Sequence, residues 1–299
     1  MAGLEMAFFN KLVRYSAMKL DQLRKRSIIF RKPLVIARNV NKWLNRRRPN
    51  AARGLNETLR PVYDEIQKTG FAPADQLVDQ HILKKLQQNA NERLASFHQA
   101  AATPTSTRKD FWRMILTPED LRESSPVVQY AMTPDILELV TAYLGSIPYL
   151  SRLELVVSQP SEKDRWKVSQ LWHKDFNDAR MVKLFTYLSD VENEQQGPFT
   201  FLPADKHDPK VSMFPIHKPD SLLSQNRDLT KKRMILGAKG TSFLIDTHRC
   251  FHCGSRILDD SHRVAFIATY TTAAPYYRYD NEIILDGIEN AEQRAVLRT

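Results

Sequence analysis

The chain has 299 residues, of which 42% are hydrophobic and 26% are charged, and its formal net charge is +10. These proportions support a folded protein with a sizeable core and exclude a chain that is disordered throughout. No apolar run approaches the roughly 18 residues of a membrane span. The first residues lack the apolar core and cleavage site of a secretory signal. With only two cysteines, Cys250 and Cys253, we expect a cytoplasmic protein with reduced thiols.

The positive charge is concentrated at the start of the chain. Residues 1–53 contain fourteen Lys and Arg against two acidic residues, a net charge of +12, so residues 54–299 carry −2. Leu4, Phe8 and Leu12 recur at helical spacing within this basic arm. Such a segment fits the interface of an anionic membrane, which would place the protein at the inner face of a membrane. It fits equally well a helix packed on the main domain. Nucleic-acid binding is not expected, because only Arg46-Arg47-Arg48 favours it.

Residues 54–146 have a mainly helical pattern. It runs from Asn56 to about His98, with a break at 70–73, and a polar stretch at 99–110 indicates a loop. Thr117-Pro118 and Thr133-Pro134 are typical helix starts, and Gly145 is a typical helix end.

Residues 147–273 have the character of strands. The segments expected to form them are 151–159, 166–173, 183–191, 199–202, 241–246 and 263–272. Short strands after a helical half indicate an α+β, mainly β protein with a double-stranded β-helix (jelly-roll) core and flanking helices. The long polar insertion at 209–239 is expected to act as a lid, and residues 274–299 form a C-terminal tail.

Three residues in this region have the pattern of a metal site. His173 and Asp175 are two residues apart, so on a strand their side chains point to the same face. Together with His252 they make a 2-His-1-carboxylate triad, which binds Fe(II) on one side and leaves positions open. His248 alternates with His252 and is the competing ligand, but the Gly254-Ser255 that follows favours His252. Cys250-x-x-Cys253 could instead be half of a zinc or redox site, although no second pair accompanies it.

Two basic residues are candidates for binding anions near the metal. Arg263 lies eleven residues after His252, and its planar fork suits bidentate binding of a carboxylate. The alternative is a structural ion pair with Asp246 or Asp259. Lys183 opens a strand from which an inward ammonium could reach co-substrate or substrate, although a solvated lysine is the more common case.

These motifs, in this order, resemble the phytanoyl-CoA dioxygenase-like family of Fe(II)- and 2-oxoglutarate-dependent oxygenases. The resemblance rests on Gly70-Phe71, Leu144-Gly145, Gln170-x-Trp172-His173-x-Asp175, Tyr187-Leu188-Ser189-Asp190-Val191, Gly197-Pro198, Leu202-Pro203 with His207, and His252-x-Gly254-Ser255 with Arg263. Pro203-Ala204-Asp205-Lys206-His207 has one residue more than the family's usual turn.

The resemblance implies catalysis by His173, Asp175, His252 and Arg263, with Fe(II), 2-oxoglutarate and O₂. It also implies that Arg263, Ser255, Gln170, Lys183 and Tyr187 contact the co-substrate. The reaction would release succinate and CO₂ and hydroxylate a small, anionic lipid-, acyl- or sugar-like substrate. Hydroxylation is favoured because halogenating members lack the carboxylate that Asp175 provides. The alternative is a non-catalytic cupin-like binding protein, but such proteins usually lose a ligand or the arginine.

Overall fold

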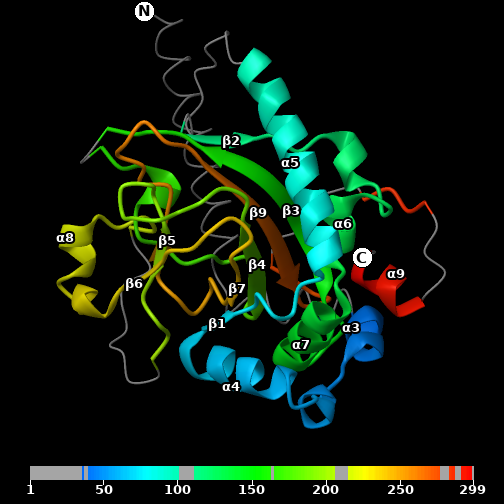
Figure 1. Cartoon of the computed structure of the whole chain (residues 1–299). Helices are drawn as coiled ribbons and strands as arrows, with labels where there is room; N and C mark the ends of the chain where they lie inside the picture. The colour runs from blue at the N-terminus through cyan, green and yellow to red at the C-terminus, as the bar shows by residue number, and fades with distance from the viewer. Residues whose placement is uncertain are drawn as a thin grey trace, which may run out of the picture.

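A computed structural model describes residue 36 and residues 40–100, 111–162, 165–205, 215–276, 283–286 and 291–297 (Figure 1). The apolar stripe from Leu4 to Leu12, the loop at 101–110, His207 and most of the C-terminal tail lie outside these residues.

The core consists of two antiparallel sheets that face each other. The large sheet has the strand order β1-β7-β4-β9-β3-β2. Its strands are β1 (Phe71–Pro73), β2 (Trp112–Met114), β3 (Tyr149–Ser158), β4 (Met181–Tyr187), β7 (Ser242–Ile245) and β9 (Arg263–Thr271). The small sheet has the order β6-β5-β8, formed by β5 (Phe199–Phe201), β6 (Arg233–Ile235) and β8 (His252–Cys253). This architecture confirms the predicted jelly roll.

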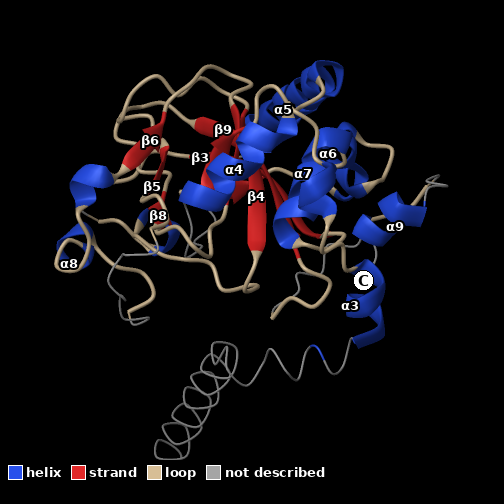
Figure 2. Ribbon diagram, turned by 90° about the horizontal axis from the view of Figure 1, so that it is seen from below, coloured by secondary structure: helices blue, strands red, loops and turns tan. Residues whose placement is uncertain are grey.

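Helices cover one face of the large sheet, and the small sheet faces the other (Figure 2). The helices on this side are α3 (Val40–Arg46), α4 (Leu59–Thr69), α5 (Gln80–Ala100), α6 (Pro126–Ala131), α7 (Pro134–Leu144) and α9 (Ala291–Leu297). The short helix α8 (Asp220–Leu223) lies beside the small sheet instead (Figure 2). Short 3-10 helices span Ala51–Gly54, Pro118–Leu121, Val168–Gln170 and Leu229–Lys231.

Alternation along the strands creates two separate cores. Leu155, Leu184 and Phe266 point to the outer face and pack with residues of α4 to α7. Phe185 and Ile267 point to the inner face and pack against the small sheet. Because strand side chains alternate, each long strand contributes to both cores, which explains why β3, β4 and β9 are almost wholly buried.

Most predicted elements are present, with instructive differences. Residues 166–173 do not form the expected strand: they contain a 3-10 turn, and only Trp172 and His173 make isolated bridges. Thr117-Pro118 starts a single 3-10 turn, in which the Asp120 carboxylate accepts hydrogen bonds from the Thr117 amide and hydroxyl. The insertion at 209–239 supplies β6, which pairs with β5, so part of it belongs to the small sheet. Its role as a lid stays a prediction.

The described end of the basic arm is packed on the domain. The Arg48 amide donates to the carbonyl of Gly145, and the Ile147 amide donates to the carbonyl of Arg46. The Arg46 guanidinium also donates to the carbonyl of Ala295 in α9. Among the described residues, no helix is both long enough and apolar enough to cross a membrane.

Candidate metal centre

The structure brings His173, Asp175 and His252 together. Their ligand atoms all lie within 4.8 Å of one another, and the two imidazole centroids are 4.2 Å apart. A two-way backbone bridge causes this, because the His173 amide donates to the His252 carbonyl at 3.0 Å and the reverse bond is 2.9 Å. The Asp175 amide donates to the carbonyl of Thr247 at 2.9 Å, which fixes the third residue. The predicted triad therefore has the geometry of a metal site.

Both imidazoles are oriented for coordination through Nε2. His173 Nδ1 lies 2.9 Å from the carbonyl of Leu171, and His252 Nδ1 lies 3.2 Å from that of Cys250. A carbonyl only accepts hydrogen bonds, so each neutral ring carries its proton on Nδ1 and exposes a lone pair on Nε2. Burial lowers the pKa of His173 to about 3 and that of His252 to about 4. Both rings are therefore uncharged at neutral pH, as metal binding requires.

Asp175 is ionised and lies beside a lysine. Burial opposes ionisation, but the charge of Lys183 holds the pKa of Asp175 well below its usual range. Lys183 Nζ is 2.7 Å from Asp175 Oδ2, and His252 Nε2 is 3.8 Å from the same oxygen. Apart from this ion pair, Oδ2 accepts no hydrogen bond from the described residues. The donor set thus fits a divalent metal with oxygen and nitrogen ligands.

The competing ligands lie elsewhere. His248 Nδ1 is 3.0 Å from the backbone carbonyl of Asp175, and its ring is not part of the triad. Cys250 and Cys253 are free thiols, and burial raises the pKa of each to about 12, so neither has thiolate character at neutral pH. His217 is half-buried, with its ring centroid 5.3 Å from that of His173. Its position within the insertion at 209–239 gave no sequence signal for this proximity.

Arg263 is a buried cation at the start of β9. Its side chain is 2% exposed, and it donates to Ser255 Oγ at 2.8 Å, to Ser158 Oγ at 3.4 Å and to the carbonyl of Gly197. Its Nε has no hydrogen-bond partner, and no carboxylate of the described residues pairs with it. A buried, uncompensated guanidinium is costly unless an anion binds to it.

The structural alternative for Arg263 is wrong. Asp246 instead accepts from the Tyr143 hydroxyl at 2.6 Å and from backbone amides. Asp259 accepts from the backbone and hydroxyl of Ser261. Neither carboxylate is available to neutralise the arginine.

Ser255, Tyr187 and Gln170 surround this arginine in different ways. Ser255 has a left-handed backbone with φ of 60°, and its hydroxyl is also 2.9 Å from Ser158 Oγ. The Arg263 guanidinium carbon lies 5.9 Å from the Tyr187 ring centroid, while the Tyr187 hydroxyl donates to the carbonyl of Ile235. Gln170 is fully buried, and its amide nitrogen donates to Ser161 Oγ and to the Ser255 carbonyl. Its hydrogen bonds favour positioning of the Ser255 turn, and its predicted contact with the co-substrate stays a prediction.

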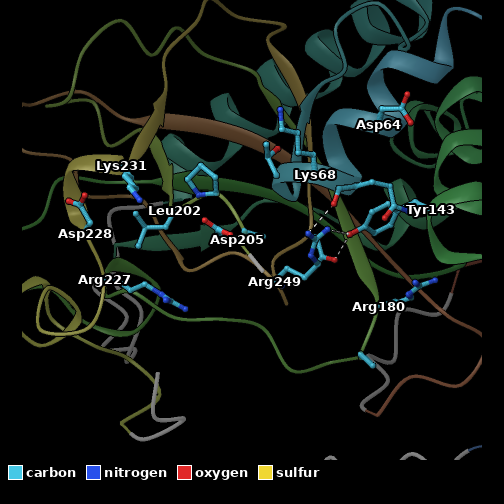
Figure 3. A pocket seen from close by; sticks show the side chains of 16 residues that line it. Asp64, Lys68, Tyr143, Arg180, Leu202, Asp205, Arg227, Asp228, Lys231 and Arg249 are labelled. Atoms are coloured by element: carbon cyan, nitrogen blue, oxygen red, sulfur yellow. Dashed lines mark hydrogen bonds between the residues drawn. The ribbon is translucent and has the colours of Figure 1, made fainter. Parts of the chain in front are cut away.

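A large cavity has a lining that includes none of the triad residues (Figure 3). Its volume is about 1080 Å³, and its lining mixes five basic with four acidic side chains: Lys68, Arg180, Arg227, Lys231 and Arg249 with Asp64, Asp205, Asp228 and Asp246. Arg249 is held in place by Tyr143 and by the carbonyls of Ile66 and Gln67. Arg180 lines this cavity, and none of the triad residues does.

No known protein family matches the sequence, and no curated protein sequence matches it. Solved structures do resemble the fold. The epimerase SnoN, in complex with Fe³⁺, α-ketoglutarate and nogalamycin RO, is 19% identical with a TM-score of 0.51, over 76% of this chain and 88% of its own. EctD from S. alaskensis with bound Fe is 15% identical with a TM-score of 0.52, over 73% and 77%. AviO1 from Streptomyces viridochromogenes Tue57 is 13% identical with a TM-score of 0.51, over 75% and 100%.

At these identities the likeness establishes the fold alone. The chain therefore has the jelly-roll fold found in non-heme, α-ketoglutarate-dependent enzymes such as SnoN. The triad is a separate finding, made from the residues of this chain.

Proposed function

We propose that the protein is an Fe(II)- and 2-oxoglutarate-dependent dioxygenase of the phytanoyl-CoA dioxygenase-like type. It hydroxylates a small anionic substrate and releases succinate and CO₂. The observation that carries this proposal is the pairing of the triad with Arg263 on the same inner face of the jelly roll. The triad provides a metal site with open positions. Arg263 provides a cation that no carboxylate of the described residues neutralises, and this cation suits the distal carboxylate of 2-oxoglutarate.

The residues fit the metal and the co-substrate on several grounds. Nε2 of His173, Nε2 of His252 and the Asp175 carboxylate would hold Fe(II), and all three are in the required protonation state. Arg263 and Ser255 would bind the distal carboxylate of 2-oxoglutarate with charge-assisted hydrogen bonds. When bound, iron, the keto acid and O₂ supply the oxidising power that converts a carbon–hydrogen bond to an alcohol.

The protein contributes orientation and exclusion of water. Phe185, Phe199 and Phe243 pack with ring centroids 4.8 to 5.4 Å apart in the inner core. These rings belong to the buried apolar cluster between the two sheets. Charge-assisted hydrogen bonds are stronger in such surroundings than in water.

The proposal is tested by anaerobic optical titration of metal-free protein with Fe(II) and then 2-oxoglutarate. A chelated keto acid gives a weak visible charge-transfer band, which we expect for the wild type and for His248→Ala, the matched control. The band should be absent in His252→Ala. In Arg263→Gln the concentration of 2-oxoglutarate at half-saturation should rise by about tenfold or more, because a charge-assisted contact is lost.

The absence of a band in folded wild-type protein would reject the oxygenase mechanism. The runner-up would then apply: a cupin-like protein that binds a metal or ligand without turnover. Release of succinate in the presence of O₂ separates the two, since only the enzyme consumes 2-oxoglutarate.

We further propose that the enzyme is cytoplasmic and that its basic arm, residues 1–53, associates with the inner face of an anionic membrane. The support is the charge of the arm, which opposes the slightly negative charge of the rest of the chain.

A further inference from the structure

The triad end of the inner face carries a row of polar side chains. In the large sheet Lys183 of β4 is the register partner of Thr269 of β9, and Thr269 is the partner of Arg152 of β3. Cross-strand partners share a face, with Cβ atoms about 5 Å apart. Thr271 follows two residues after Thr269 and faces the same way, about 7 Å further along the strand. Lys183 contacts the metal ligand Asp175, so the row begins beside the metal site.

The two threonines of this row are unsatisfied. Thr269 and Thr271 are 1% and 0% exposed, and neither hydroxyl has a hydrogen-bond partner in the described residues. Burial of a hydroxyl without a partner is unfavourable and uncommon in native proteins.

The opposite face of the same sheet shows that the fold can satisfy buried hydroxyls. There Thr186 Oγ1, Ser242 Oγ and the Tyr130 hydroxyl form a closed set with distances of 2.9 to 3.0 Å. Thr269 and Thr271 belong to no such set among the described residues.

The sum of the charges in the site indicates the charge of a ligand that would bind there. Arg152 and Glu154 neutralise each other in an ion pair of 2.9 Å. Iron(II) bound by Asp175 leaves one positive charge, Lys183 and Arg263 add one each, and 2-oxoglutarate removes two. One positive charge remains in the buried site, and Lys183 lies opposite Thr269 in the sheet. A buried site of this kind favours a ligand with a single negative charge.

Solvent reaches the start of the row. The side chains of Lys183 and Asp175 are 16% and 18% exposed, whereas Arg263 is 2% exposed. A small molecule can therefore approach Lys183 from outside, while the Arg263 end is closed.

The geometry points to a carboxylate-binding subsite for the primary substrate, formed by Lys183, Thr269 and Thr271. This inference rests on the proposed function and names its substrate class, a small monocarboxylate. Lys183 supplies the charge, and the two hydroxyls donate to the carboxylate oxygens. Because Lys183 contacts Asp175, the carbon that reacts lies within a few bonds of this carboxylate.

The test uses full-length protein loaded with Zn(II), a redox-inert metal, and saturated with 2-oxoglutarate. Calorimetry measures the affinity for butyrate and for its neutral isostere butyramide. We expect the wild type to bind butyrate at least about tenfold more tightly than butyramide, a tenfold ratio being about 1.4 kcal/mol. Lys183→Met should abolish this preference.

Two isosteric variants separate binding from folding. Thr269→Val and Thr271→Val should weaken butyrate binding while raising the melting temperature, because each removes an unsatisfied buried hydroxyl. A merely structural threonine would give no loss of affinity. Lys68→Met is the matched control, because Lys68 is an exposed lysine that lines the large cavity, and it should bind butyrate normally.

Any of three results would reject the subsite. The wild type could bind butyrate no more tightly than butyramide, or Lys183→Met could keep the preference of the wild type. Alternatively, Lys68→Met could lose the preference, which would place the anion in the large cavity. The charge-transfer titration reports on the proposed function separately. A normal band without butyrate preference rejects this subsite only. A Lys183-dependent preference without a band rejects the oxygenase and retains a carboxylate-binding protein.

Discussion

The two imidazoles of the metal site are buried in the uncharged form. In the folded protein the pKa values of His173 and His252 are about 3 and about 4, below the 6.5 of an exposed histidine. The unfolded chain therefore binds more protons than the folded chain between about pH 4 and pH 6.5. Metal-free protein should lose stability as the pH falls through this window.

This prediction is tested by urea unfolding of metal-free wild type and His252→Gln at several pH values. One imidazole contributes a slope of up to about 1.4 kcal/mol per pH unit. The slope of the wild type should exceed that of His252→Gln by roughly this amount. Burial raises the pKa of Asp178 to about 6, which gives a slope of opposite sign, but this carboxylate is present in both proteins and cancels in the comparison. Equal slopes would contradict the burial of His252 as a neutral ring.

At the scale of elements, the site depends on how β8 is placed against the first helices. Gly70 ends α4 in a left-handed conformation with φ of 78°, and its carbonyl accepts from the Asp246 amide. A Cβ at this position would lie 2.5 Å from Cys250 Sγ and 3.3 Å from Ala204 Cβ. Glycine is therefore required both by the backbone angle and by the close approach of the segment that leads to His252.

Gly70→Ala is expected to lower the free energy of unfolding by about 3 kcal/mol, combining left-handed strain with overpacking. Chemical denaturation of wild type, Gly70→Ala and Gly54→Ala measures this. Gly54 is the control because a Cβ there would meet nothing within 4 Å. A cost for Gly70→Ala no larger than that for Gly54→Ala would show that the Cys250 segment moves freely away.

Strand alternation explains how a few elements serve two purposes. The outer faces of β3, β4 and β9 form the core with the helices, and their inner faces carry Lys183, Thr269 and Arg263. The same period of two places Phe185 and Ile267 on the inner face with them. The site is therefore a consequence of the sheet and does not need a separate domain.

At the scale of the whole molecule, the basic arm divides into two parts. Residues 40–53 contact α7 and α9 through Arg46 and Arg48. Deletion of residues 1–39 should leave the melting temperature unchanged and reduce partition onto anionic liposomes. Deletion of residues 1–53 should also lower the melting temperature, because it removes these contacts.

Sedimentation with vesicles of anionic and of neutral lipid tests the predicted loss of membrane partition. Thermal unfolding tests the predicted change in melting temperature. The charge of the arm predicts that partition onto anionic vesicles weakens with salt. Partition that is unchanged after deletion of residues 1–39 would reject membrane binding by that segment.

The sequence by itself determined the fold class and the triad. Alternating apolar residues predicted β3, β4, β7 and β9 within one or two residues at most ends, and Pro and Gly marked both ends of α7. His173, Asp175 and His252 were identified by local spacing and by the motifs around them, since a ligand set must be encoded in the identity of its residues.

Only the tertiary structure decided what these residues contact. Residues 166–173 have strand-like composition but contain a 3-10 turn, and the backbone of His173 pairs with that of His252, 79 positions later. Local propensity contains no information on such long-range pairing. For the same reason the sequence did not show which residues neighbour Lys183. Nor did it show that Thr269, Thr271 and Arg263 lack a hydrogen-bond or carboxylate partner among the described residues. Which polar groups are paired depends on the register of distant strands, and the register is set when the sheet forms.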